Sequence, residues 1–325
     1  MPKRLPKKRK KISSLRLILG AIICLLFLGI VWRTYQGFHQ SVWDGDSQIN
    51  LVLASQPVTI VSFSPGRGSL KILLIPDKTF IETVHGYGQY RVEVLEGLGE
   101  LESRPSLLAE SCQEYLGLPV DGWVGGERKE MIFSQTGQEG ERQIKQTLTN
   151  RLFQLIKKKE KTNLTRWDLV RLWRQINTVR FDKVTLIDLS KTSALLAKTL
   201  PDGTTGFEID QNRLDSLIAR YFQDDKLREE GLSLEILNAT DHAGLASQGA
   251  RVITNLGGRV IGIKDWPSRN DQCQIRSKQE KASSYTLKRL AKIFACQLTG
   301  EDLGDSRAEA VIILGEDYWR KLKEK

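Results

Sequence analysis

The carboxylate of Asp77 stands where α/β enzymes often place a catalytic acid. Asp77 follows Pro76 at the end of the strongest strand-like run of the chain, LKILLIP (70–76), and active sites of α/β sheets gather at the carboxyl ends of strands. General acid/base catalysis needs a second group, and no carboxylate or histidine in the same motif pairs with Asp77. The sequence motif alone therefore does not predict a reaction for Asp77.

A second candidate site is the turn of residues 237–244 (LNATDHAG), between a predicted strand and a predicted helix. Backbone N–H groups and the positive end of a helix dipole can hold an anion at such a junction, which makes Asn238, Thr240, Asp241 and Gly244 candidate ligand-binding residues. The same residue types are typical of an Asx turn that caps the helix, and we prefer that interpretation. The turn lacks G-x-G-x-x-G and a P-loop lysine, so no nucleotide site is expected.

The usual metal and nucleophile motifs do not occur in the sequence. The three histidines, His39, His85 and His242, lie far apart, and there is no CxxC, HExxH or G-x-S-x-G pattern. We therefore expect no metal and no cofactor. His242 belongs to the turn of residues 237–244, but an exposed loop histidine is its simplest interpretation.

The cysteines fit an exported protein that does not depend on disulfides. Cys24 falls inside an apolar segment, which leaves Cys112, Cys273 and Cys296 as an odd number without close spacing. A bridge between Cys273 and Cys296 is left open by this pattern.

The net charge of +10 is concentrated at the N-terminus. Residues 1–16 carry eight of the 49 Lys and Arg and no acid, so residues 17–325 have 41 positive against 39 negative side chains. A domain that follows nucleic-acid phosphates carries its excess charge on the fold itself. The nearly neutral body of this 325-residue chain therefore argues against a nucleic-acid partner.

The basic tail is followed by a segment with the composition of a membrane span. Residues 17–32 (LILGAIICLLFLGIVW) contain no charge, proline or amide and are bounded by Arg16 and Arg33. As a helix they would measure about 24 Å, slightly less than the roughly 30 Å hydrocarbon core. The flanking arginines can snorkel, and Trp32 can lie at the interface. The positive-inside rule then places residues 1–16 in the cytoplasm and the rest of the chain outside.

Other interpretations of this N-terminus explain less. A cleaved signal peptide lacks a small-x-small site, because the residues after the apolar run are RTYQ (33–36). Nuclear localisation would explain only the basic residues, which the adjacent span also explains. A buried core helix would need neither a basic flank nor an aromatic end. We therefore expect a single-pass signal anchor, followed by a polar linker over residues 33–47.

Local patterns predict several elements of the chain after the linker. Residues 59–64 and 69–75 should form a hairpin across the turn PGRG (65–68). Thr165-x-x-Asp168 is a capping box at the start of a helix, and residues 192–200 are expected to be a short helix ended by a proline.

The alternation of strand-like and helix-like segments predicts an α/β fold. Residues 223–231 (QDDKLREEG) carry six charges and little apolar periodicity, so we expect a linker there. The prediction is thus a transmembrane helix and two extracytoplasmic α/β domains, a larger one over residues 48–222 and a smaller one over residues 232–325.

Residues 232–318 carry motifs in an order typical of a known family. LNAT (237–240) is followed by GLA (244–246) at a helix start, and LGEDY (314–318) lies near the end of the chain. This order resembles the LytR C-terminal domain, whose typical runs are V-x-V-L-N-G-T, G-L-A and V-V-L-G-x-D-Y. Ala239 stands where the family prefers glycine, so the turn is not expected to need a positive φ there.

The preceding domain resembles the LytR-CpsA-Psr domain. Residues 73–79 (LLIPDKT) are similar to its S-I-P-R-D-T, residues 116–124 (LGLPVDGWV) to its L-G-I-P-I-D-Y-Y-V, and residues 141–143 (ERQ) to its R-x-x-R-Q. For catalytic members, the resemblance implies transfer of a glycopolymer from a polyprenyl pyrophosphate carrier to the cell wall. Arginines, acids and Mg²⁺ would hold the pyrophosphate.

The pattern breaks where this chemistry would lie. No arginine stands between Pro76 and Asp77, and 17 residues separate Val124 from Arg142, where the family has a longer insert with further arginines. A pyrophosphate needs several converging cations or a metal to offset its charge. Asp77 and Arg142 are therefore remnant catalytic candidates and not a complete site.

Two functions follow from these resemblances. The first is a membrane-anchored extracytoplasmic protein of the bacterial cell envelope that binds or scaffolds without catalysis, with cell-wall glycan or an envelope protein as its partner. The alternative is a shortened phosphotransferase that moves a glycopolymer from polyprenyl pyrophosphate to peptidoglycan with Mg²⁺. A catalytic form should hold at least three arginines in a cleft beside Asp77, and Arg67, Arg91 and Arg142 are the nearest in sequence. DNA-binding regulation ranks third, because both domains would lie outside the membrane.

Overall fold

The computed structural model describes residues 40–131, 137–158, 160–200, 203–300 and 303–323, with Leu19, 22–25, 27–29 and Trp32 nearer the N-terminus. The basic tail of residues 1–16 and linker residues 33–39 lie outside the described residues. The described residues of the predicted span are helical and exposed. Over the described part of the chain, no helix is both long and apolar enough to cross a bilayer. The span of residues 17–32, described only in part, stays a prediction.

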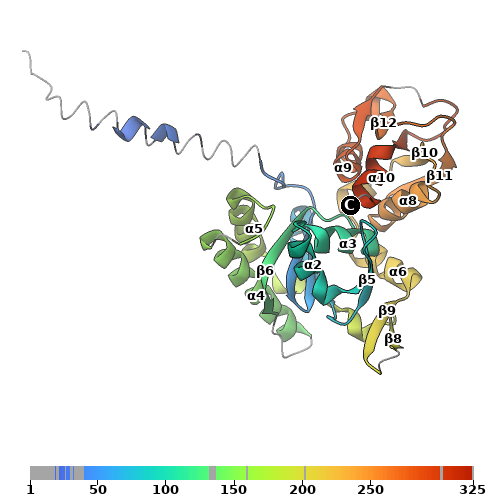
Figure 1. Ribbon diagram of the computed structural model, residues 1–325. Coiled ribbons are helices and arrows are strands. Elements are labelled where there is room, and N and C mark those ends of the chain that lie inside the picture. Colours follow the sequence, from blue (N-terminus) through green and yellow to red (C-terminus); the bar gives the residue numbers. More distant parts are fainter. Residues whose placement is uncertain are drawn as a thin grey trace, which may run out of the picture.

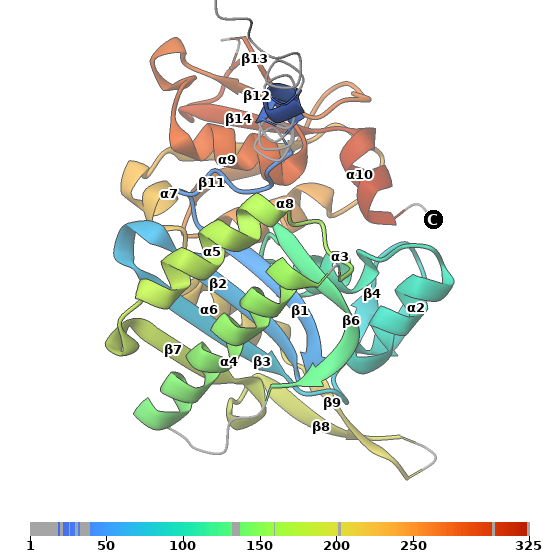
Figure 2. The same ribbon diagram turned by 90° about the vertical axis from the view of Figure 1, so that its left-hand side faces the viewer.

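A five-stranded sheet forms the centre of the larger unit (Figure 1 and Figure 2). Its strand order is β6-β1-β2-β3-β7, and β2 runs antiparallel to the other four strands. The strands are β1 (Ile49–Gln56), β2 (Val58–Ser64), β3 (Ser69–Ile75), β6 (Gly122–Glu130) and β7 (Val184–Asp188). The predicted hairpin is confirmed, with Gly68 at φ +57 closing the turn between β2 and β3.

Helices cover both faces of this sheet (Figure 2). They are α2 (Leu95–Leu101), α3 (Leu107–Leu116), α4 (Gln138–Lys157), α5 (Arg166–Thr178) and α6 (Gln211–Tyr221). Leu51 and Val61 belong to the core beneath α4 and α5, whereas Val52 and Ile60 belong to the core beneath α2, α3 and α6. Because both faces are covered, β1 and β2 are buried along nearly their whole length and show no alternation of buried and exposed residues.

Two small hairpins extend from the larger unit. They are β4 (Phe80–Thr83) with β5 (Gly88–Arg91), and β8 (Leu195–Thr199) with β9 (Thr205–Ile209). The predicted helix over residues 192–200 is wrong, because five of these residues pair with β9 instead. Gly206 lets β9 approach the β4 hairpin, since a Cβ there would lie 2.5 Å from the Phe80 ring.

The smaller unit is built on a second five-stranded sheet, in the order β11-β10-β14-β12-β13. Only the β12 and β14 pair is antiparallel. Its elements are β10 (Ser233–Asn238), α8 (Leu245–Asn255), β11 (Arg259–Asp265), β12 (Gln274–Ser277), α9 (Tyr285–Phe294), β13 (Gln297–Thr299), β14 (Ala310–Leu314) and α10 (Glu316–Lys323). Cys273 and Cys296 form a disulfide with their Cα atoms 4.5 Å apart, so the bridge left open by the sequence is present. Both units are α/β, as predicted.

The segments predicted as linkers are folded where they are described. Trp43 is 2% exposed, and its N–H and that of Val42 donate to the Asp168 carboxylate over 3.3 and 3.1 Å. Between the two units, residues 225–230 form α7 (Asp225–Glu230), whose Leu227 is buried. Their polar composition predicted a boundary, but the buried side chains Trp43 and Leu227 dock both segments on the folded units.

A buried ion pair joins the two units. Arg289 on α9 donates two hydrogen bonds of 2.6 and 2.9 Å to Asp121, just before β6, and the two side chains are 3% and 7% exposed. Nearby, Arg251 on α8 donates to Asp215 on α6 and to the carbonyl of Glu114 on α3. One apolar core also continues from the α3 side of the first sheet into the smaller unit. The two sheets are therefore held together by both polar and apolar contacts.

Candidate functional site

Asp77 lies at the carboxyl edge of the first sheet and binds one arginine. β1, β3 and β6 run parallel to one another, so the residues at their ends meet at the same edge. Arg128 in β6 donates from Nη2 to Asp77 Oδ1 over 2.6 Å and to the carbonyl of Ser55 over 3.0 Å. A guanidinium stays protonated in proteins and cannot act as a base. The contact therefore gives Asp77 a counterion and no acid/base partner.

A buried carboxylate behind this pair sets the position of Arg128. Glu96 on α2 accepts the N–H of Gly126 over 2.7 Å, and a Cβ on Gly125 would lie 2.3 Å from its Oε1. Burial raises the pKa of Glu96, and the Gly126 hydrogen bond and the charges of Lys161 and Arg128 partly offset this. The register between β1 and β6 shifts at this place. The two glycines thus let β6 bend around Glu96 before it reaches Arg128.

Two of the arginines expected beside Asp77 contact other side chains instead. Arg67 is in the turn that precedes β3, and its Nε is 2.8 Å from Asp225. The guanidinium of Arg142 lies 5.4 Å from the ring centroid of Phe181, which comes just before β7. Because β7 runs parallel to β3, the amino end of β7, which Phe181 precedes, lies away from Asp77. The two remnant catalytic candidates are not brought together.

Arg91, the third expected arginine, has partners of its own. Its guanidinium lies 5.6 Å from the Phe80 ring centroid and 3.7 Å from the Glu93 carboxylate. Within the described chain, Arg128 is the one cation in ion-pair distance of Asp77. Sequence reasoning missed Arg128 because it reaches Asp77 only through the pairing of β6 with β1.

Asp77 is the carboxylate beside which the alternative function would place Mg²⁺. Mg²⁺ usually takes one or two carboxylates and completes a nearly octahedral set of oxygen ligands with waters and substrate phosphates. The Asp77 carboxylate is already paired with Arg128, and nowhere in the described residues do three His, Cys, Asp or Glu side chains converge as metal ligands.

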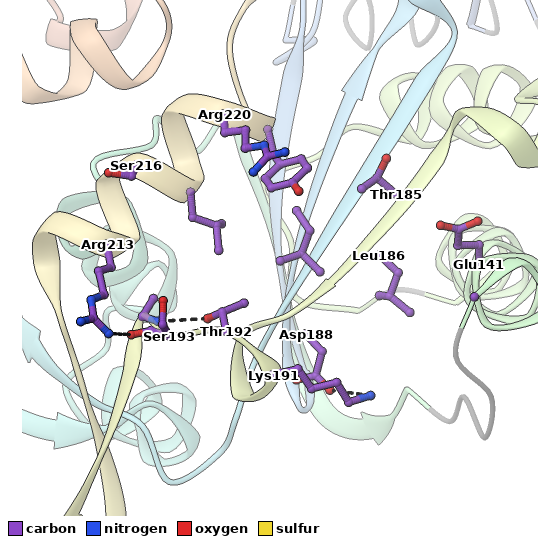
Figure 3. A pocket seen from close by; sticks show the side chains of 15 residues that line it. Glu141, Thr185, Leu186, Asp188, Lys191, Thr192, Ser193, Arg213, Ser216 and Arg220 are labelled. Carbon is purple, nitrogen blue, oxygen red and sulfur yellow. Dashed lines mark hydrogen bonds and ion pairs between the residues drawn. The ribbon is translucent and has the colours of Figure 1, made fainter.

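The cavity in Figure 3, of about 570 Å³, is separate from this pair. It is lined by β7, by the turn that follows β7, by α6 and by Glu141 of α4. Lys191 pairs with Asp188 at 3.3 Å, and Arg213 donates to the carbonyl of Ser193 over 3.0 Å. Burial raises the pKa of Glu141. Neither Asp77 nor Arg128 is among the lining residues, so the cavity does not extend their site.

In the smaller unit, the candidate ligand-binding turn is closed by its own side chains. Asn238 Oδ1 accepts the N–H and the hydroxyl of Thr240 over 3.1 and 2.8 Å, and Asn238 Nδ2 donates to the carbonyl of His242 over 3.1 Å. Gly244 has φ +86, a conformation that favours glycine, and α8 begins at the next residue. This geometry is that of an Asx turn. Ligand binding by Asn238, Thr240, Asp241 and Gly244 stays a prediction.

The start of α10 covers this turn. Asp241 forms an ion pair with Arg269. His242 Nε2 lies 3.1 Å from Glu316 Oε2, and the His242 ring stacks on Trp319 with centroids 3.6 Å apart. His242 is therefore partly buried and packed on Trp319, and not the exposed loop histidine that was expected. The motifs of residues 237–244 and 314–318, far apart in sequence, meet here.

This junction of motifs lies within a family match. Residues 231–318 match the LytR_C family model, described as LytR cell envelope-related transcriptional attenuator. The smaller unit is a LytR_C domain. The match covers the LytR_C domain from β10 into α10 and confirms the resemblance found in its motifs. No curated protein matches the chain significantly.

Several solved structures are also similar to the chain. The crystal structure of Bacillus subtilis TagT is 15% identical, covers 54% of this chain and 89% of its own, and has a TM-score of 0.40. TagV of the same organism is 14% identical, with coverage of 53% and 94% and a TM-score of 0.39. The LytR-CPS2A-psr family protein YwtF (TagT) with bound octaprenyl pyrophosphate lipid is 16% identical, with coverage of 54% and 89% and a TM-score of 0.38. At these identities and TM-scores the matches carry no argument about the family or the activity of this chain.

Proposed function

We propose that this chain is a membrane-anchored, extracytoplasmic protein of the bacterial cell envelope that binds or scaffolds at the cell wall without transferring a glycopolymer. The LytR_C match supports the cell-envelope setting. The Cys273–Cys296 disulfide supports a location outside the cytoplasm, because disulfides persist in oxidising compartments. The basic tail and the apolar segment of residues 17–32 support an anchor with its N-terminus in the cytoplasm.

The side chains around Asp77 support the proposal that the protein does not catalyse transfer. The Asp77 carboxylate pairs with Arg128, the one cation of the described chain within ion-pair distance. Arg67 pairs with Asp225, and the Arg142 guanidinium lies beside the Phe181 ring. Pyrophosphate chemistry needs several converging cations or a metal ion. Losing one such contact costs about 3 kcal/mol, roughly 10²- to 10³-fold in rate. With more than one contact lacking, transfer should fall below detection.

A sedimentation assay tests the binding function. The full chain, purified in detergent, is mixed with washed cell wall from which proteins have been stripped. We expect saturable retention of the protein in the pellet, and none on cellulose as a control for non-specific trapping. Protein that stays in the supernatant at every wall concentration would rule out glycan binding.

A transfer assay tests the absence of catalysis. The full chain is incubated with a polyprenyl-pyrophosphate-linked glycan, Mg²⁺ and peptidoglycan, and the wall is analysed for added glycan. We expect no transfer above background. Transfer that disappears in Asp77→Ala or Arg142→Ala would establish the shortened phosphotransferase in place of our proposal.

A further inference from the structure

A cavity of about 930 Å³ opens between α4, α5 and the turn η3 (Phe181–Lys183), on the helical face turned toward the viewer in Figure 2. Three aromatic rings line it. Phe153 is 41% exposed and Phe181 is 45% exposed, while Trp173 is partly buried beside Phe153 with ring centroids 5.6 Å apart. Scattered exposed aromatic residues need no explanation, but aromatic rings that converge on one cavity are typical of a ligand site.

Three side-chain amides line the same cavity. They belong to Gln146 and Asn150 on α4 and Asn177 on α5, and all three residues are exposed. The described chain provides no hydrogen-bond partner for any of these amide groups. A side-chain amide both donates and accepts hydrogen bonds, so it can bind a hydroxyl group in either role. The cavity therefore offers a ligand both apolar ring faces and amide groups that can form hydrogen bonds with it.

A buried cation lies at the wall of the cavity. Lys145 is 7% exposed, and its Nζ donates to the carbonyl of Asn177 over 3.1 Å and to the carbonyl of Val179. It also lies 4.8 Å from the ring centroid of Phe181. No carboxylate of the described residues lies within ion-pair distance of Lys145 Nζ. Burial lowers the pKa of Lys145, because desolvation disfavours the charged form. An anion beside Nζ would offset this penalty.

Further positive charge surrounds the same rings. The Arg142 guanidinium lies 5.4 Å from the Phe181 ring centroid, and Lys157 Nζ lies 4.2 Å from the Phe153 ring centroid. Asp182 is the one acidic residue among those lining the cavity, and Arg180 pairs with it at 3.0 Å. The excess charge of the cavity is therefore positive.

We propose that this cavity binds a carboxylate-bearing glycan, an inference that rests on the proposed function. The C–H faces of sugar rings lie flat on aromatic rings, and their hydroxyl and acetamido groups pair with amides. Phe153 and Phe181 supply the ring faces, the three amides bind the polar groups, and Lys145 and Arg142 face the carboxylate. Two cations suit a singly charged carboxylate, whereas a pyrophosphate needs more of them.

Titration calorimetry on the full chain in detergent tests the cavity with two probes. One is a tetrasaccharide of alternating N-acetylglucosamine and N-acetylmuramic acid, and the other is chitotetraose, which has the same backbone without carboxylates. We expect the acidic tetrasaccharide to bind roughly tenfold more tightly than chitotetraose.

Three variants test the roles of the lining residues. Phe153→Ala should weaken the binding of both probes by about tenfold. Lys145→Met should remove the preference for the acidic probe, and the exposed Arg142→Gln should reduce it even if Lys145→Met fails to fold.

Trp167→Ala is the matched control. Trp167 lies on α5 and is 46% exposed, but it does not line the cavity, so both affinities should be unchanged. Equal affinity of the wild-type chain for the two probes, no binding of either, or an unchanged affinity in Phe153→Ala overturns the cavity assignment. If Phe153→Ala is still retained on the cell wall as the wild type is, only this assignment falls. If the wild type is not retained, the proposed function falls as well.

Discussion

At the scale of single residues, Arg289 and Asp121 form a buried ion pair between the two units. Burial alone would lower the pKa of Arg289, but the charge and hydrogen bonds of Asp121 more than compensate, so its pKa lies above the ordinary value. Asp224, which begins α7, lies 3.7 Å from Arg289 Nε and accepts the Tyr285 hydroxyl over 2.6 Å. The guanidinium is thus held by carboxylates from the larger unit and from the connecting segment.

Arg289→Met should lower the free energy of unfolding by about 3 to 5 kcal/mol, because it leaves Asp121 buried without its counterion. Urea unfolding followed by circular dichroism measures this change. The neighbouring Lys288 is exposed, so Lys288→Met should stay within about 0.5 kcal/mol of the wild type. If Arg289→Met lowers the free energy of unfolding no more than Lys288→Met does, the ion pair does not stabilise the contact between the two units.

At the scale of elements, the start of α5 shows a local motif that also holds a distant segment. Thr165 and Asp168 form the predicted capping box. The same Asp168 carboxylate, which is fully buried, accepts the Ser41 hydroxyl over 2.5 Å and the N–H groups of Val42 and Trp43. One side chain therefore begins the helix and fixes the chain that leads from the predicted span.

Two substitutions separate these roles of the α5 start. Thr165→Ala removes the cap and one donor to the Asp168 carboxylate but leaves the contacts with Ser41, Val42 and Trp43, and it should cost about 1 kcal/mol. Asp168→Ala also leaves the buried Trp43 N–H without its acceptor, at about 1 to 3 kcal/mol for such a group, so it should cost at least twice as much. Thermal unfolding gives the order, and limited proteolysis near residues 41–47 should increase in Asp168→Ala alone. Equal losses in the two variants would show that the carboxylate acts only as a cap.

At the scale of the whole molecule, the charge distribution along the chain predicts its orientation in the membrane. The excess positive charge lies in residues 1–16, the apolar segment follows, and both α/β units come after it. The described linker residues dock on α5, and Lys292 of the smaller unit donates to the carbonyl of Val42 over 2.5 Å. Residues 42 and 43 therefore contact both units.

Protease added to intact spheroplasts tests the predicted orientation in the membrane. It should remove the mass after residue 33 and spare a tag placed before residue 1, because the positive-inside rule keeps the basic tail in the cytoplasm. Lysed spheroplasts serve as the control and should lose the tag as well. Release of a soluble body without the tag during export would show a cleaved signal peptide instead.

The sequence by itself determined the features that depend on neighbouring residues. The turn PGRG predicted the β2–β3 hairpin, Thr165 and Asp168 predicted the cap of α5, and the runs at 237–246 and 314–318 identified the LytR_C domain before any fold was known. Turn chemistry, caps and short motifs act over a few residues, which is why a single chain is enough to recognise them.

The tertiary structure decided which distant side chains meet. Arg128 reaches Asp77 only because β6 pairs with β1, whereas the Arg142 guanidinium lies beside the Phe181 ring. Residues 195–199 form a strand and not the predicted helix, because they pair with β9 along their whole length. Strand pairing and burial depend on partners far away in sequence. No local pattern contains that information, so the cation beside Asp77 and the cavity between α4 and α5 could be seen only in the folded chain.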